Sequence, residues 1–160
     1  MSGEDRRDAT EVLDRIGFDP ASNVLTQRQA EILLLRRWGY SQAAIAEQLC
    51  TSRANVTNIQ GSAEENVAKA RETVRVVEAM AAPVRVSIDA GTDVYEIPEL
   101  VYDACNDVDL KVAHTAPQLI KRLLEDAEDA IDGRTVERPL TVSVNVDGDV
   151  EIRQPNADPP

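Results

Sequence analysis

The stretch SQAAIAEQLCTSRANVTNIQ, residues 41–60, decides the fold of the N-terminal half of the chain. It holds two short segments of mixed polar and apolar residues, joined by three or four residues. Ser41 and Ser52 precede the two segments, and serine is a favoured N-cap because its hydroxyl accepts a hydrogen bond from a backbone N–H. The stretch therefore predicts a helix over 42–49, a tight turn and a further helix that begins after Ser52.

The apolar spacing indicates that these two helices cross at a steep angle. Ile45 lies next to Ala46 on the first helix, and Val56 and Ile59 follow later, on the second helix. Two crossing helices need a small residue where they touch, and apolar residues of the second helix must close over it. The turn residue three or four positions after the small residue usually has a positive φ, and Cys50 stands there. The spacing is that of a helix-turn-helix.

A preceding helix completes the predicted core. The run TQRQ, residues 26–29, fits a capping box, in which the Thr26 hydroxyl accepts from the backbone of Gln29 and the Gln29 side chain reaches back. We expect this helix to end before Gly39, and its apolar residues are Ile32, Leu33 and Leu35. Residues 1–25 predict an acidic, partly disordered extension with one or two helical turns.

The helix after Ser52 can be long because no strong helix breaker precedes Pro83. At Gly61 two alternatives are open. The helix could end there, with Ser62 and Glu65 forming a new capping box, or it could continue through the glycine at a cost of about 1 kcal/mol. We favour the continuous helix, which gives a helix-turn-helix domain over 26–82 with a long third helix.

The hydrophobic period changes at Ala82-Pro83, which we take as the domain boundary. Residues 83–153 predict a small α+β domain that ends in a β-hairpin, followed by a tail over 154–160. Its expected elements are a strand at 84–88, a helix from Pro98 to about Asp107, a strand at 110–113, a helix at 115–131 and a hairpin at 140–153 with Asp147-Gly148 as its two-residue turn. The fold class is therefore α+β, with an all-helical domain first.

The chain is strongly acidic, and the acidity is uneven. Its 160 residues carry 29 Asp and Glu against 17 Lys and Arg, a formal net charge of −12. Residues 1–82 have a net charge of −2 and residues 83–160 have −10, while arginine outnumbers lysine 14 to 3. Dense carboxylates with few lysines are typical of a salt-rich cytoplasm, where salt screens their repulsion; an acidic mesophilic protein is the alternative. With no signal peptide or membrane span indicated, we expect a cytoplasmic protein.

The outer face of the helix after Ser52 has side chains of the kinds that read DNA bases. Arginine pairs with guanine, asparagine with adenine, and the threonine methyl with thymine, while helix N-termini offer N–H groups to phosphates. Residues 26–60 hold four arginines and two glutamates, a net charge of +2. A merely solvated face is the alternative. We predict that double-stranded DNA is contacted by Arg28, Arg36, Arg37, Ser41, Gln42, Thr51, Ser52, Arg53, Asn55, Thr57 and Asn58.

These residues resemble a known family. The run LTQRQAEILLLRRWGYSQAAIAEQLCTSRANVTNIQGSAEENVAKARETV, residues 25–74, is similar to the Tfx family of archaeal DNA-binding proteins and candidate transcription regulators. The resemblance continues more loosely through GTDVYEIPELVYDACNDVDLKV and the final hairpin, and it covers roughly residues 24–152. It implies a DNA-binding N-terminal half, a C-terminal α+β half of undefined role, and contact positions at Ser52, Arg53, Asn55 and Thr57. One departure is Cys50, where such families usually have glycine.

The long helix also predicts a homodimer. Ala63, Val67, Ala70, Val74, Val77 and Ala81 follow a four-three spacing typical of a coiled-coil seam. We expect Val67, Ala70, Val74 and Val77 to form the dimer interface. A contribution of the C-terminal sheet to this interface, and packing of the stripe on the chain's own C-terminal half, are the alternatives left open.

Other chemistry is sparse in the sequence. Cys50 and Cys105 fit reduced core residues, and the single histidine, His114, fits a structural role. We expect no catalytic residue, metal site or cofactor. The main function predicted is sequence-specific regulation of transcription. The alternative is that the C-terminal half is a module that senses a small molecule or binds a protein, with an unknown effector.

Overall fold

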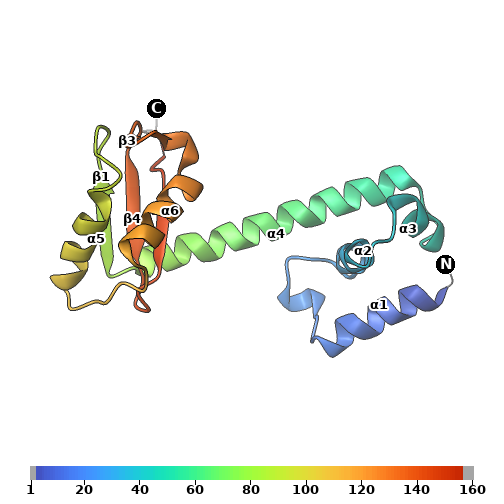
Figure 1. Ribbon diagram of the computed structural model, residues 1–160. Coiled ribbons are helices and arrows are strands. Elements are labelled where there is room, and N and C mark those ends of the chain that lie inside the picture. The colour runs from blue at the N-terminus through green and yellow to red at the C-terminus, as the bar shows by residue number, and fades with distance from the viewer. Residues whose placement is uncertain (1–2, 157–160) are drawn as a thin grey trace. The chain divides into compact units, whose positions relative to one another are not determined.

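The computed structural model describes residues 3–156, with side chains from Arg7 onward. The chain forms two compact units, the first ending at Thr73 and the second beginning at Val74. Helices come first, and a small antiparallel sheet with a C-terminal hairpin follows (Figure 1), which confirms the α+β class. The domain boundary predicted from the sequence, at Ala82-Pro83, lies nine residues after the division between these two units. Whether the chain folds as two domains that meet at Ala82-Pro83 stays a prediction. The last four residues of the expected tail lie outside the described residues.

The N-terminal unit begins with a helix that is longer than we expected. Helix α1 spans Gly3–Arg15, 13 residues rather than one or two turns, and a short 3₁₀ helix, η1, follows at Pro20–Ser22. Helix α1 is longer than predicted because it is stabilised by tertiary packing. Ala9 and Leu13 are almost fully buried, and α1 contacts the next helix, α2, which spans Gln27–Arg37.

Three helices follow the caps that the sequence predicts. Helix α2 has the complete capping box between Thr26 and Gln29. Helix α3 spans Gln42–Gln48 and is capped by the Ser41 hydroxyl, which accepts from the backbone of Ala44 at 3.1 Å. Helix α4 spans Arg53–Ala81 without a break at Gly61, so the continuous helix is confirmed.

The core of the N-terminal unit joins all four helices. Ile32, Leu35, Ile45 and Val56 have no exposed surface, and Ala9 and Ala46 pack with them. Ile59 packs at the edge of this cluster, as its spacing predicts. Leu33 was the wrong choice for the α2 core face: it is half-buried outside the cluster, and Leu34 packs against the cluster instead.

The main sheet of the C-terminal unit is antiparallel, has three strands and is covered on one face. Strands β1 (Val84–Ile88), β4 (Leu140–Val144) and β5 (Val150–Arg153) form the sheet in the order β1-β4-β5. Helices α5 (Ile97–Asn106) and α6 (Ala116–Asp126) pack on the face that carries the buried valines, leucines and isoleucines of the strands (Figure 1). The expected first strand, both helix starts and the final hairpin are confirmed.

Two predicted elements of this unit are wrong. Residues 110–113 form a loop rather than a strand, because the loop packs on the final hairpin, where the Ala113 backbone donates to Gly148 O at 2.9 Å. The helix expected to reach Ile131 ends at Asp126. A 3₁₀ turn, η2 (Glu128–Ala130), and a small hairpin of β2 (Ile131–Asp132) and β3 (Thr135–Val136) replace its last turn and bury Ala130 and Val136.

The turn of the final hairpin also differs from the prediction. Val144 pairs with Val150, and Asn145 and Asp149 pair next, so the loop has three residues rather than the two of Asp147-Gly148. The Asn145 side chain selects this turn, because its Oδ1 accepts from the backbone N–H groups of Asp147 and Asp149 at 3.0 and 2.9 Å.

Among residues 3–156, no helix has the length and apolar content needed to cross a membrane.

Candidate nucleic-acid interface

The turn between α3 and α4 has the geometry that the spacing predicts. Cys50 has a φ of +52°, the left-handed conformation that lets a helix end sharply. The backbone N–H of Thr51 donates to Ala46 O at 2.9 Å and that of Cys50 to Glu47 O at 3.2 Å, which is a Schellman ending. The Ser52 hydroxyl then caps α4 by accepting from the backbone of Asn55 at 3.1 Å.

The two cysteines have different surroundings. Cys50 is exposed, so its assignment to the core was wrong, and its place is set by the turn rather than by burial. Cys105 lies in the core of the C-terminal unit, as expected, and burial raises the pKa of its thiol. Neither cysteine is paired in a disulfide.

A short chain of hydrogen bonds joins α3 to α4. The Thr57 hydroxyl lies 3.0 Å from Gln42 Oε1, and Gln42 Nε2 donates to Gln60 Oε1 at 3.1 Å. Gln60 donates in turn to Glu64 at 2.7 Å. These bonds fix the position of α3 on the first turns of α4. The sequence predicted Gln42 and Thr57 as DNA contacts but gave no indication of Gln60, whose role depends on side-chain conformation.

The polar residues on the outer face of α4 fall into two groups. Asn55 Nδ2 donates to the Thr51 hydroxyl at 2.9 Å, and Thr57 is engaged with Gln42. In contrast, the side chains of Arg53 and Asn58 are exposed and make no hydrogen bond or ion pair with any other described residue, although the Arg53 carbonyl oxygen lies 3.0 Å from the Thr57 hydroxyl. Their donor and acceptor groups are therefore available to an external partner.

Basic residues of two helices border one hollow beside this face. The hollow has a volume of about 450 Å³ and is lined by Arg36 of α2, Arg53 of α4, and Ser41, Gln42 and Ala43 at the start of α3. Arg36 is held in place because its Nη1 donates to Tyr40 O at 2.6 Å. Two guanidinium groups and a serine hydroxyl border the recess, and the positive charge of the arginines suits an anion such as a phosphate.

The remaining predicted basic contacts differ from each other. Arg37 is exposed, without a hydrogen bond or ion pair to the other described residues. Arg28 is half-buried and lies 3.8 Å from the carboxylate of Glu31, whose side chain is only 6% exposed. The ion pair leaves Arg28 less charge to offer to a partner than Arg37 has.

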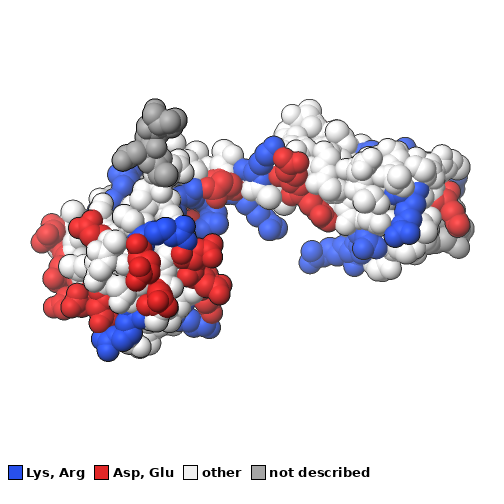
Figure 2. Space-filling model, turned by 90° about the horizontal axis from the view of Figure 1, so that it is seen from above, with Lys and Arg blue, Asp and Glu red and all other residues white. Residues whose placement is uncertain are grey.

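The charges of the two units differ in kind. On the face that Figure 2 shows, Asp and Glu are crowded over the α+β unit and are fewer over the N-terminal unit. The predicted contact segment, residues 26–60, keeps its net charge of +2 within a chain of −12. The segment is thus locally basic, although the chain as a whole is an anion.

The residues expected at a dimer seam are unequally exposed along α4. Val74 and Val77 each have 56% of their surface exposed, while Val67 and Ala70 are half-buried. Ala63 has no exposed surface, so it is not available to a second chain.

Comparison with known proteins identifies the family of the chain. Residues 70–152, more than half of the chain, match the family described as DNA-binding protein TFX, C-terminal part. The helical start and α+β end therefore belong to a class of proteins named as DNA-binding or as transcriptional regulators. Within that class, the chain belongs to the Tfx family, which confirms the resemblance.

The relatives match over most of their length. A candidate transcriptional regulatory protein of Haloarcula marismortui is 45% identical over 97% of this chain and 98% of its own. Another, of Methanocaldococcus jannaschii, is 36% identical over 80% of this chain and 93% of its own. The DNA-binding protein Tfx of Methanothermobacter thermautotrophicus is 33% identical over the same shares, 80% and 93%.

Proposed function

We propose that the chain is a cytoplasmic transcription regulator that binds double-stranded DNA sequence-specifically through a helix-turn-helix made of α3 and α4. The observation that carries this is the pair of unengaged side chains, Arg53 and Asn58, on the exposed face of a helix whose Val56 is fully buried. The name of the Methanothermobacter relative supports DNA as the partner.

The proposed contact residues fall into two groups, those that contact DNA bases and those that contact the phosphate backbone of the DNA. Arg53 and Asn58 reach base edges in the major groove, arginine to guanine and asparagine to adenine. A phosphate occupies the recess beside Arg36 and Ser41, and Arg37 contacts a neighbouring phosphate. Asn55 and Thr57 are engaged within the protein, so their part is to hold the reading face in place, together with Gln42 and Thr51.

The test compares the reading face with a distant arginine. A bound duplex is first obtained by mapping the DNA that the full chain occupies across a genome. The double variant Arg53→Ala/Asn58→Ala is then titrated against that duplex and a scrambled one by fluorescence anisotropy. The matched control is Arg134→Ala, an exposed arginine of the α+β unit. We expect the double variant to lose the preference for the mapped duplex and the control to keep it; the reverse result contradicts the proposal.

We also propose that the regulator is a homodimer joined through α4. The exposed Val74 and Val77, together with Val67 and Ala70, supply the seam at the spacing of a coiled coil. Exposed valines in the last turns of a helix gain from burial against a second copy, at roughly 25 cal/mol per Å² of apolar surface removed from water. A two-fold dimer would place two reading helices on one duplex, as DNA-binding dimers commonly do.

A further inference from the structure

A second hollow lies wholly within the C-terminal unit and has no role in the proposed DNA contact. Its volume is about 470 Å³, within the range of small-molecule pockets. The last turns of α4, the middle of α6 and the hairpin of β4 and β5 line it. The polar lining residues used below are Glu78, Arg122, Ser143, Asp147, Asp149 and Glu151.

Ser143 is the feature that indicates a ligand. It lies on β4 opposite Glu151 of β5 and Arg85 of β1. Only 4% of its surface is exposed, and it lines the hollow. Within the described part of the chain its hydroxyl makes no side-chain hydrogen bond. The hydroxyl oxygen is nevertheless not fully enclosed, so a ligand in the hollow can form a hydrogen bond with it in place of water.

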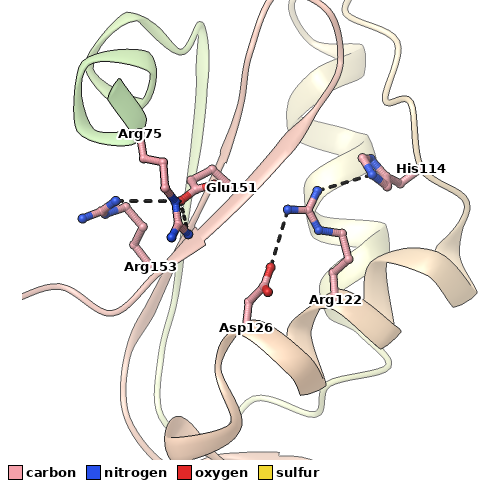
Figure 3. Close-up of polar contacts among 6 residues, drawn as sticks. All are labelled: Arg75, His114, Arg122, Asp126, Glu151 and Arg153. Atoms are coloured by element: carbon pink, nitrogen blue, oxygen red, sulfur yellow. Dashed lines mark hydrogen bonds and ion pairs between the residues drawn. The ribbon is translucent and has the colours of Figure 1, made fainter. Parts of the chain in front are cut away.

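The charges around the hollow favour a cation. Glu151 is neutralised by Arg75 at 2.6 Å and Arg153 at 3.7 Å (Figure 3). Arg122 lies 3.5 Å from Asp126 and 3.3 Å from His114 Nε2, so its charge is also partly matched (Figure 3).

Three lining carboxylates are not paired with a cationic side chain of the described residues. Glu78, Asp147 and Asp149 form no ion pair with any described residue. The hollow therefore carries an excess of negative charge, in addition to the unpartnered Ser143 hydroxyl. An ammonium group matches this set, because it donates three hydrogen bonds and carries one positive charge.

The carboxylates are arranged to suit a molecule with several separated positive charges rather than a single metal ion. Among the described residues, no three His, Cys, Asp or Glu side chains come close enough together to hold a metal ion. Separated carboxylates around a hollow of about 470 Å³ fit a molecule that carries its positive charges at intervals. We propose that this hollow binds a linear diamine or polyamine, with one ammonium on the Ser143 hydroxyl and the others on Asp147, Asp149 or Glu78. The proposal is independent of DNA binding.

The test titrates the full chain, without DNA, with putrescine, butylamine and MgCl₂ by isothermal calorimetry. The buffer has the lowest KCl concentration at which circular dichroism shows the chain folded. We expect saturable binding of putrescine, weaker binding of butylamine and none of comparable affinity for Mg²⁺. Ser143→Ala should weaken putrescine binding by about tenfold or more, because a hydrogen bond to a charged group is lost. Asp149→Asn should weaken it by roughly three- to tenfold.

Asp132→Asn is the matched control, since it removes one exposed carboxylate of the same unit outside the hollow. Its putrescine affinity should equal that of the wild type. Equal losses in Asp132→Asn and Asp149→Asn would show diffuse attraction to an acidic surface and overturn the proposal. So would the absence of saturable putrescine binding, or butylamine or Mg²⁺ binding as tightly as putrescine. Thermal unfolding of each variant verifies that it is folded.

Discussion

The hydroxyl of Thr57 lies 3.0 Å from Oε1 of Gln42, so the second turn of α4 is tied to the first turn of α3. Both residues belong to the predicted DNA-contact set, yet their side chains are hydrogen-bonded to each other. The angle between the two helices therefore depends on side chains of the reading face itself, and a change there affects both stability and recognition.

Removing this hydroxyl tests that dependence. We expect Thr57→Val to lower the free energy of unfolding by about 0.5–1.5 kcal/mol, the usual net value of one hydrogen bond, and to weaken binding to the specific duplex. Thr73→Val is the control, because the Thr73 hydroxyl donates only to Lys69 O, one turn back on the same helix. Urea unfolding and fluorescence anisotropy give the two quantities. Equal effects of the two variants would show that the bond between α3 and α4 is unimportant.

Arg53 and Arg37 are expected to play different roles on DNA. Arg53→Ala should cost about 1–3 kcal/mol on the specific duplex and relax the preference for one base pair, because a base contact is lost. Arg37→Ala should weaken binding to specific and scrambled duplexes alike, as the loss of a phosphate contact does. Anisotropy titrations on both duplexes measure the difference. If Arg53→Ala loses the same affinity on both, Arg53 does not read a base.

The turn at Cys50 is strained where glycine would not be. The left-handed conformation destabilises the folded state by roughly 1–2 kcal/mol for an L-residue other than glycine. Glycine removes this strain, but it stabilises the unfolded state by about 0.4–1 kcal/mol because the unfolded chain is more flexible there. We therefore expect Cys50→Gly to raise the free energy of unfolding by about 0.5–1 kcal/mol. Gly39, with a φ of +92°, ends α2 in the same way, so Gly39→Ala should have the opposite sign. Urea unfolding of both variants is the measurement, and a destabilised Cys50→Gly would contradict the positive φ.

Local sequence patterns were sufficient to predict much of the structure of the N-terminal unit. The caps at Thr26, Ser41 and Ser52 and the apolar spacing around Ala46 all act within a few residues, so they can be read along the chain. Helix α1 was underestimated because Ala9 becomes a core residue only once α2 is in place. In the C-terminal unit, residues 110–113 alternate like a strand, but their partner is the hairpin turn at Gly148, which no local pattern reveals.

The same distinction holds for the candidate interface. Burial of Val56 turns Asn58 outward, because residues two apart on a helix lie on different faces. Arg53 lies three residues before Val56 and is exposed at the first residue of α4. Which polar side chains are engaged inside the protein depends on rotamers chosen by neighbours on another helix, as with Gln60 and Gln42. The hollow around Ser143 joins α4, α6 and a hairpin distant from them in sequence, so it could not be predicted from the chain.

The homodimer makes a prediction that depends on α4 alone. Val74→Glu places a charge in the proposed seam, where a buried unpaired carboxylate is strongly unfavourable, and we expect the variant to be a folded monomer. Val108→Glu is the control, since Val108 is 53% exposed outside the seam and Val74 is 56% exposed. Light scattering gives the mass and circular dichroism the fold. A monomeric wild type, or a Val74→Glu variant that stays a folded dimer, removes the seam as the interface.

Acidity and DNA binding can be reconciled if the protein works at high salt. Residues 83–160 carry a net charge of −10, and at low salt this charge repels DNA. At ~1 M salt the screening length is about 3 Å, so those carboxylates no longer act at the DNA, whereas direct contacts from the locally basic segment persist. The cost is that counterion release stops helping, since affinity usually falls by ~0.9 decades per phosphate contact for each decade of salt.

We therefore expect the salt dependence of this protein to be the reverse of the usual one. At low salt the carboxylates crowded over the α+β unit (Figure 2) repel each other as well as DNA, so the fold itself should loosen. Folding and specific binding should both be better near ~2 M KCl than near ~0.1 M. Affinity at high salt must then come from base contacts, packing and released water, which makes Arg53→Ala relatively more damaging there. Circular dichroism and anisotropy across that range decide it, and a chain fully folded and binding most tightly near ~0.1 M would rule out adaptation to high salt.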